Sequence, residues 1–113
     1  MHELPAVTEI INTLDEESRK NGLSRIKKVD FIIGELSSIE EECVRSYFEL
    51  LSQGRTSEGA ELEFTKAYAR LRCPKCGREF EHSRGFDCPE CGSGGILIKG
   101  TGREFVIKEI TGE

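Results

Sequence analysis

Two copies of one cysteine pattern constrain the fold of this 113-residue chain more than any other feature. Each copy reads Cys-Pro-x-Cys-Gly. Two residues between the cysteines allow a tight turn to aim both thiolates at one ion, and the glycine can adopt the positive φ that such a turn requires. Four thiolates suit tetrahedral zinc and leave no open position for water chemistry. The predicted ligands of a structural zinc ion are Cys73, Cys76, Cys88 and Cys91.

Two other uses of four cysteines remain as alternatives. A rubredoxin-like iron centre has the same ligands, and a secreted mini-domain would pair the cysteines in disulfides. The residues from Met1 to Pro5 lack the basic start of a signal peptide, so we expect a cytoplasmic protein. In that reducing compartment, close cysteine pairs are more often metal ligands. Because Phe80 and Phe86 are almost the only large apolar residues of the lobe, the metal is expected to decide whether it folds.

Hydrophobic periodicity predicts helices and strands on both sides of the cysteine segment. The expected helices cover residues 4–21 and 38–54, and the expected strands cover residues 26–36, 62–71, 96–98 and 105–110. Ser38 and Glu41 have the spacing of a capping box for the second helix. The buried stripe of this helix is expected to comprise Cys43, Tyr47, Leu50 and Leu51.

This order of elements predicts an α+β fold. Two helices would pack on a small mixed β-sheet, and a zinc-ribbon-like domain with four cysteine ligands would be inserted into it. The expected boundaries place an α/β domain at residues 1–71 plus 100–113 and a zinc-binding domain at residues 72–99.

Composition argues against several classes of function. The net charge of -5 and the pI near 5.2 disfavour broad binding to nucleic acid or to an anionic membrane, and no apolar run is long enough to span a bilayer. With two histidines and no nucleophile–base pair, the chain is not expected to be an enzyme. A zinc-ribbon nucleic-acid binder remains an alternative. Its basic residues, which would also offset the charge of a zinc tetrathiolate, are Lys66, Arg70, Arg72, Lys75, Arg78 and Arg84.

The first three residues offer a second kind of metal chemistry. The amine of Met1, the deprotonated amide of His2 and its imidazole can form fused chelate rings, and the amide of Glu3 or an outside ligand can supply a fourth donor. Such nitrogen donors favour square-planar Ni(II) or Cu(II). Taken alone, a histidine in second position is also consistent with an ordinary disordered terminus.

Several motifs together resemble those of the HypA/HybF family, the nickel-insertion accessory proteins of NiFe hydrogenase. They are Met1-His2-Glu3-Leu4, Ile33-Gly34-Glu35-Leu36-Ser37, Glu58-Gly59-Ala60 and the two cysteine knuckles, in that order over essentially the whole chain. The resemblance implies that His2 is the essential nickel ligand, with the Met1 amine and the Glu3 backbone beside it. It also implies zinc at the four cysteines and makes residues 1–71 plus 100–113 a nickel-binding domain. Pro5 and Ser38 depart from the family pattern.

The resemblance further implies the partners. These are a HypB-type nickel GTPase and the large subunit of NiFe hydrogenase, and some members also serve urease. Ni(II) would then be transported cargo and Zn(II) a structural cofactor. A homodimer remains open.

Three residues have two interpretations each. Cys43 is expected to be a small core residue rather than a ligand. His82 could donate a hydrogen bond beside the zinc site or sense pH, or it could be an exposed loop residue. Glu35 could be a surface group at a strand end or a contact for a partner.

Overall fold

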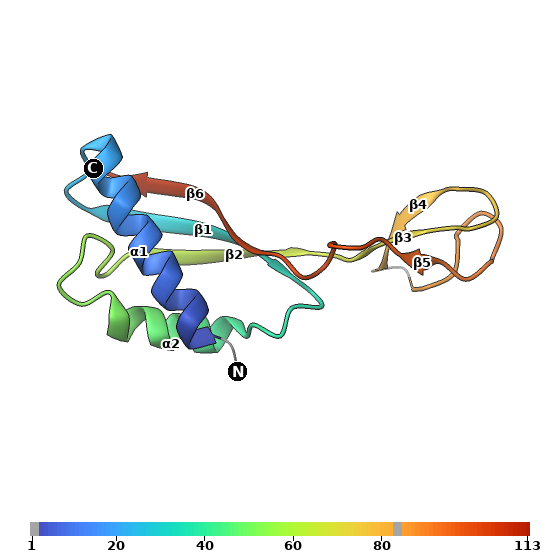
Figure 1. Ribbon diagram of the computed structural model, residues 1–113, viewed down its shortest axis with the longest axis horizontal. Coiled ribbons are helices and arrows are strands. Elements are labelled where there is room, and N and C mark those ends of the chain that lie inside the picture. The colour runs from blue at the N-terminus through green and yellow to red at the C-terminus, as the bar shows by residue number, and fades with distance from the viewer. Residues whose placement is uncertain (1–2, 83–84) are drawn as a thin grey trace. The chain divides into compact units, whose positions relative to one another are not determined.

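The computed structural model describes residues 3–82 and 85–113 (Figure 1). Its elements are α1 (Glu3–Asn21), β1 (Ile26–Gly34), α2 (Glu41–Leu51), β2 (Glu61–Ala67), β3 (Arg70–Arg72), β4 (Glu79–Glu81), β5 (Ile96–Leu97) and β6 (Phe105–Gly112). The chain divides into two compact units. The first unit comprises Met1–Ile32, Ser38–Thr65 and Val106–Glu113, and the second comprises Ile33–Ser37 and Lys66–Phe105.

Strand β1 lies between β2 and β6 in a three-stranded sheet. Its pairing with β6 is antiparallel, because the residue numbers of the hydrogen-bonded partners decrease along β1 from its first residue to its last. The Arg25 N–H donates to the Glu113 carbonyl at 3.2 Å, and the Gly34 N–H donates to the Glu104 carbonyl at 2.6 Å.

The pairing of β1 with the β2 side runs in the other sense. The Ile26 N–H donates to the Thr56 carbonyl and the Glu35 N–H donates to the Ala67 carbonyl, both at 2.8 Å. The residue numbers of both partners increase together, so this pairing is parallel. Two parallel strands need a long crossover segment to connect them. Helix α2 supplies that crossover (Figure 1). The sheet is therefore mixed, and the predicted α+β class is confirmed.

The core of the first unit forms where α1 and α2 pack on the sheet (Figure 1). Its buried apolar side chains are Val7, Ile11, Leu14, Ile26, Val29, Phe31, Val44, Phe48 and Leu62. The expected stripe of α2 is wrong in part. The fully buried positions are Val44 and Phe48, whereas Cys43, Tyr47 and Leu51 are only half-buried and Leu50 is 63% exposed. The expected capping box at Ser38 is also wrong, because the N-cap is Glu40 and makes no side-chain cap bond.

The second unit holds a smaller sheet in the order β4-β3-β5. Both neighbours run antiparallel to β3, with Leu71 opposite Phe80 and opposite Leu97. The expected continuous strand over residues 62–71 is interrupted at Tyr68 and Ala69, so that β2 and β3 are separate elements. The buried cluster of this unit is small, and two of its members are cysteines: Leu71, Cys73, Phe80 and Cys88.

Three chain segments of the second unit approach closely beside this break. Gly102 has φ of +80°, and a Cβ built on it would lie 2.7 Å from the Cβ of Ala69. A Cβ on Gly34 would collide with the backbone of Gly102. Glycine is therefore required at both positions, since any larger residue would push these segments apart.

Candidate metal centre

The two cysteine knuckles have the same backbone geometry. In the first, the Gly77 N–H donates to the Cys73 carbonyl at 2.9 Å, and Gly77 has φ of +76°. In the second, the Gly92 N–H donates to the Cys88 carbonyl at 2.9 Å, and Gly92 has φ of +75°. The predicted left-handed glycine after each pair is thus confirmed. Each knuckle presents its two sulfur atoms through the same tight turn.

The two knuckles bring their four thiols to one point. The Sγ atoms of Cys73, Cys76, Cys88 and Cys91 all lie within 4.8 Å of one another. The Cys73–Cys91 sulfur distance is 3.3 Å and the Cys76–Cys88 distance is 3.6 Å. A tetrahedron with Zn–S bonds of about 2.3 Å has sulfur–sulfur edges of about 3.8 Å, so the cluster has the size that a zinc ion needs. All four thiols are free, so the disulfide alternative finds no support in this geometry.

Backbone donors and thiol neighbours give the four groups unequal acidity. The Ser93 N–H, with the Cys73 thiol, lowers the pKa of Cys91 to about 6. The Arg78 N–H acts to lower the pKa of Cys76, yet the surrounding thiols, Cys73 first among them, raise it to about 11. Thiolates packed this closely repel one another, so full ionisation of the set requires a cation in the middle. This electrostatic requirement fits a divalent metal.

The cluster is buried on one side and accessible on the other. Cys73 and Cys88 are buried against Phe80, whereas Cys76 and Cys91 are exposed. Gly95 carries no side chain because a Cβ there would lie 2.7 Å from the Phe80 ring. Cys73 and Cys88 therefore form half of the only described apolar cluster in this unit, which joins its folding to the state of the four thiols.

Glu35 and His82, which the sequence left with two interpretations each, are partners. The Nδ1 atom of His82 lies 2.8 Å from Oε1 of Glu35, and the Ala69 N–H donates to the same oxygen at 2.9 Å. Burial acts to raise the pKa of Glu35, but the Ala69 and His82 donors outweigh it and the pKa is lowered. The ring of His82 also lies 4.2 Å from that of Phe86. His82 is thus neither a free loop residue nor in a described contact with a thiol.

The residues predicted for nickel are only partly described. Met1 and His2 lie outside the described residues. Glu3 begins α1 and is 4% exposed, and its Oε2 accepts a hydrogen bond from the Glu40 N–H at 3.1 Å. Its carboxylate therefore joins the first turn of α1 to the N-cap of α2.

Cys43 is half-buried and lies beside acidic groups. Its Sγ is 3.9 Å from Oε2 of Glu40, and burial, followed by the charges of Glu3 and Glu40, raises its pKa. A thiol with a raised pKa stays protonated at neutral pH and is a poor nucleophile. The expectation of a core residue is wrong in part, because the fully buried stripe of α2 passes through Val44 instead.

Comparison with known proteins places this geometry in a family. The family model described as "Hydrogenase/urease nickel incorporation, metallochaperone, hypA" matches residues 1–112. The chain belongs to the HypA family. Members of this family are metallochaperones rather than enzymes, so the expectation that the chain is not an enzyme is confirmed.

Relatives over the full length agree with membership of the HypA family. The chain is 42% identical over 111 residues to "Hydrogenase maturation factor HypA" of Caldanaerobacter subterraneus subsp. tengcongensis, covering 97% of each chain. It is 38% identical to the protein of the same name from Moorella thermoacetica, covering 100% of each. Among solved structures, "Solution structure of HypA protein" gives a TM-score of 0.73 at 25% identity and covers 100% of this chain and 97% of the other.

A structure of "the Ni metallochaperone HypA from Helicobacter pylori" gives a TM-score of 0.69 at 24% identity and covers 99% and 97% of the two chains. That level of identity shows the same fold. No helix among the described residues is both long and apolar enough to cross a membrane.

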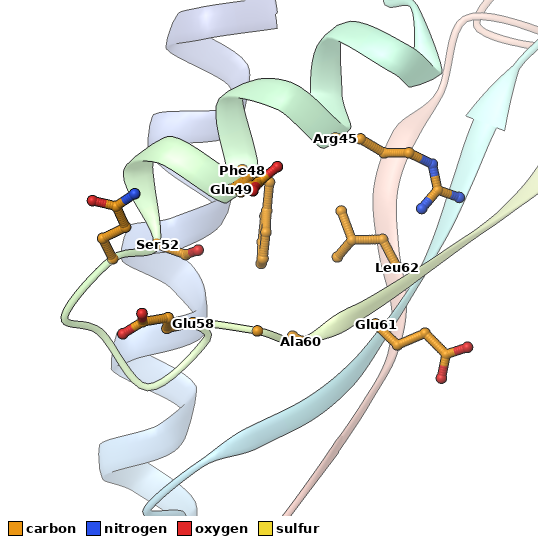
Figure 2. Close-up of a pocket in the computed structure, with 10 residues that line it drawn as sticks. Arg45, Phe48, Glu49, Ser52, Glu58, Ala60, Glu61 and Leu62 are labelled. Atoms are coloured by element: carbon orange, nitrogen blue, oxygen red, sulfur yellow. The ribbon is translucent and has the colours of Figure 1, made fainter.

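The first unit of this HypA-family chain also has a surface hollow of about 500 Å³ between α2 and the start of β2 (Figure 2). Phe48 and Leu62 form its apolar part, and Arg45 lies at one side (Figure 2). The Arg45 guanidinium is already engaged, since it bonds Glu41 at 3.1 Å and lies 4.9 Å from the centre of the Phe64 ring. The residues that line the hollow include neither cysteine nor histidine, so they offer no soft metal ligand.

Proposed function

We propose that this chain is a nickel-binding accessory protein that delivers Ni(II) for the maturation of NiFe hydrogenase, with a structural zinc ion at its four clustered cysteines. The full-length match to a family described by nickel incorporation carries the proposal. Delivery to urease is the second destination that the same description names. A HypB-type nickel GTPase and the hydrogenase large subunit are the proposed partners.

The nickel site that we propose uses the first residues of the chain. The Met1 amine and the His2 amide and imidazole supply nitrogen donors, and the Glu3 backbone lies beside them in sequence. Such donors prefer a square-planar ion. Glu3 is held at the start of α1, where its Oε2 accepts a hydrogen bond from the Glu40 N–H.

This arrangement suits transfer as well as binding. Ligands at the start of a chain can be exchanged one at a time without opening a buried core. Metal displaces protons from the amide and the imidazole, so nickel affinity should fall as pH falls. Zinc is held differently, since each knuckle is built into the fold of the second unit and two of its four cysteines are buried. Four thiolates complete the tetrahedral coordination of zinc, so no position stays open for a substrate or water and the role of the ion is structural.

The test compares the only two histidines of the chain. His2→Ala is expected to abolish stoichiometric nickel binding in a calorimetric titration, because it removes the imidazole from the chelate. His82→Gln is the matched control and should keep wild-type nickel affinity. Both variants should retain one zinc ion and the wild-type circular dichroism spectrum. Full nickel affinity in the His2→Ala protein would contradict the proposal.

A second arm isolates the terminal amine. A form extended by two residues before Met1 keeps every side chain but converts the amine into an amide. Its nickel affinity should drop although its fold and zinc content do not change. Unchanged nickel affinity in the extended form would exclude the terminal amine as a ligand and would contradict this part of the proposed site.

A further inference from the structure

The outer side of β5 in the second unit carries an unusual group of exposed side chains. Ile96 is 62% exposed and Leu97 is 42% exposed. With Pro74 and Ile98 they line a groove of about 290 Å³. Isolated exposed apolar residues are common on protein surfaces, whereas a contiguous apolar groove marks a place of contact.

The backbone of β5 is also open on this side. In the sheet order β4-β3-β5, β5 is an edge strand. The Ile98 N–H donates to the Arg70 carbonyl at 2.8 Å, and Leu97 lies opposite Leu71 in the antiparallel register. Bonded and non-bonded pairs alternate in such a ladder. Leu97 therefore belongs to a non-bonded pair, and its own N–H and carbonyl point away from β3. An edge with free backbone groups can accept another strand.

Charge at the groove has one sign. Its two charged lining residues are Arg72 and Lys99, and no acidic residue lines it. Arg72 bonds Glu79 at 2.9 Å in an exposed pair, which is weak and exchangeable. Lys99 forms no ion pair with any residue in the ranges 3–82 and 85–113. This basic groove lies on a chain whose net charge is -5, so it contrasts with the protein as a whole.

Two simpler explanations account for less. A lysine at a sheet edge can serve only to prevent pairing, but that role does not require two exposed apolar residues beside it. A symmetric pairing of β5 with a second copy of this chain would place Arg72 and Lys99 of both copies together, and like charges oppose such contact. An acidic segment with an apolar side chain accounts for the exposed apolar residues and meets no repulsion from the basic ones.

We propose that the β5 groove is a docking site for an extended acidic segment of a partner protein that adds a strand at Leu97, places an apolar side chain against Ile96 and offers a carboxylate to Lys99. This inference does not depend on nickel binding, because no residue of the groove belongs to the proposed nickel site. So small a contact is expected to be weak and transient.

The test titrates the zinc-loaded, isotope-labelled protein with short blocked peptides and follows the backbone amide signals by NMR. The acidic probe has the sequence EVEIEV, the basic probe has the sequence KVKIKV, and a third probe is EVEIEV with alternate amides methylated. The acidic probe should shift signals of residues 72–74 and 96–99 and leave those of α1 unchanged. The basic and methylated probes should bind at least about tenfold more weakly, since they lack the charge or the strand donors.

Two variants locate the contact. Ile96→Ser and Lys99→Glu should each weaken binding of the acidic probe by about tenfold or more, and both residues are exposed, so the fold should persist. Val106→Ser and Lys108→Glu on β6 are matched controls with exposed side chains and should bind normally. The proposal is overturned if the acidic probe causes no shift at residues 96–99 at millimolar concentration, or if the basic probe binds equally well. A single-stranded oligonucleotide shifting these signals more strongly than the peptide would also overturn it.

Discussion

At the scale of single residues, one carboxylate oxygen organises the break between β2 and β3. Oε1 of Glu35 accepts the Ala69 N–H and the proton of His82 Nδ1, and the Glu35 side chain is 14% exposed. The Ala69 carbonyl accepts the His82 N–H at 2.8 Å. Because the lowered pKa keeps Glu35 ionised and purely an acceptor at neutral pH, His82 must carry its proton on Nδ1. The hydrogen bond from the Ala69 N–H to the Glu35 carboxylate takes the place of the backbone hydrogen bond that Ala69 would make in an uninterrupted strand.

Glu35→Gln should therefore destabilise the protein at neutral pH by about 1–2 kcal/mol, the difference between a charged and a neutral acceptor. A carboxyl whose pKa is lowered on folding stabilises the protein above its unfolded value, and this contribution disappears as the pH falls through the folded value. The difference between wild type and variant should shrink as the pH drops below about 4.5. Urea denaturation with excess zinc at several pH values measures it. The exposed Glu109→Gln serves as the control, and a pH-independent difference would contradict the role of the charge.

At the scale of elements, α2 shows why periodicity alone misplaced a helix face. The sequence carries two overlapping apolar stripes, one through Cys43, Tyr47 and Leu50 and one through Val44 and Phe48. They differ by a rotation of one residue, and both satisfy helical spacing. Contacts with distant segments decide between them, such as Arg45 over the Phe64 ring. Such contacts leave no signal in the local pattern.

The rotation of α2 predicts unequal effects of two similar substitutions. Val44→Ala removes two methyl groups from a side chain that is 1% exposed and should cost about 2 kcal/mol of unfolding free energy. Leu50→Ala removes more atoms from a side chain that is 63% exposed and should change stability by less than about 0.5 kcal/mol. Urea denaturation midpoints compare them. Equal losses of unfolding free energy in the two variants would contradict burial of the Val44 face and favour the face expected from the sequence.

At the scale of the whole molecule, local chemistry was predictable and distant pairing was not. The cysteine spacing fixes two turns within five residues each, and the structure builds both as expected. The mixed sheet also followed from the order of elements. In contrast, Glu35 and His82 are 47 positions apart, and the hydrogen bond from Glu40 to the Glu3 carboxylate spans 37. Such pairs depend on how finished elements pack, which a single sequence does not display.

The two units should respond differently to loss of the metal. The first unit has a core of large aliphatic and aromatic side chains, whereas the described buried cluster of the second has four members, and Cys73 and Cys88 are two of them. Binding of structural zinc contributes on the order of 10–16 kcal/mol, which is comparable to the whole stability of a domain, about 5–15 kcal/mol. Without zinc the second unit has too little buried apolar surface to offset its loss of conformational entropy. We therefore expect folding of that unit to require the metal and folding of the first unit to be independent of it.

Cys76→Ala tests this asymmetry, because Cys76 is an exposed member of the cluster and its loss leaves no cavity in the core. Amide signals of residues 66–105 should collapse to random-coil positions, while those of α1 and α2 stay dispersed and the helical circular dichroism signal persists. Cys43→Ala is the matched control, since Cys43 is the one cysteine outside the cluster and its removal should leave both sets of signals in place. A chelator added to the wild type should reproduce the Cys76→Ala spectrum. Global loss of helical signal would show that the first unit depends on zinc after all, and a dispersed spectrum for residues 66–105 without metal would show that apolar packing alone holds the second.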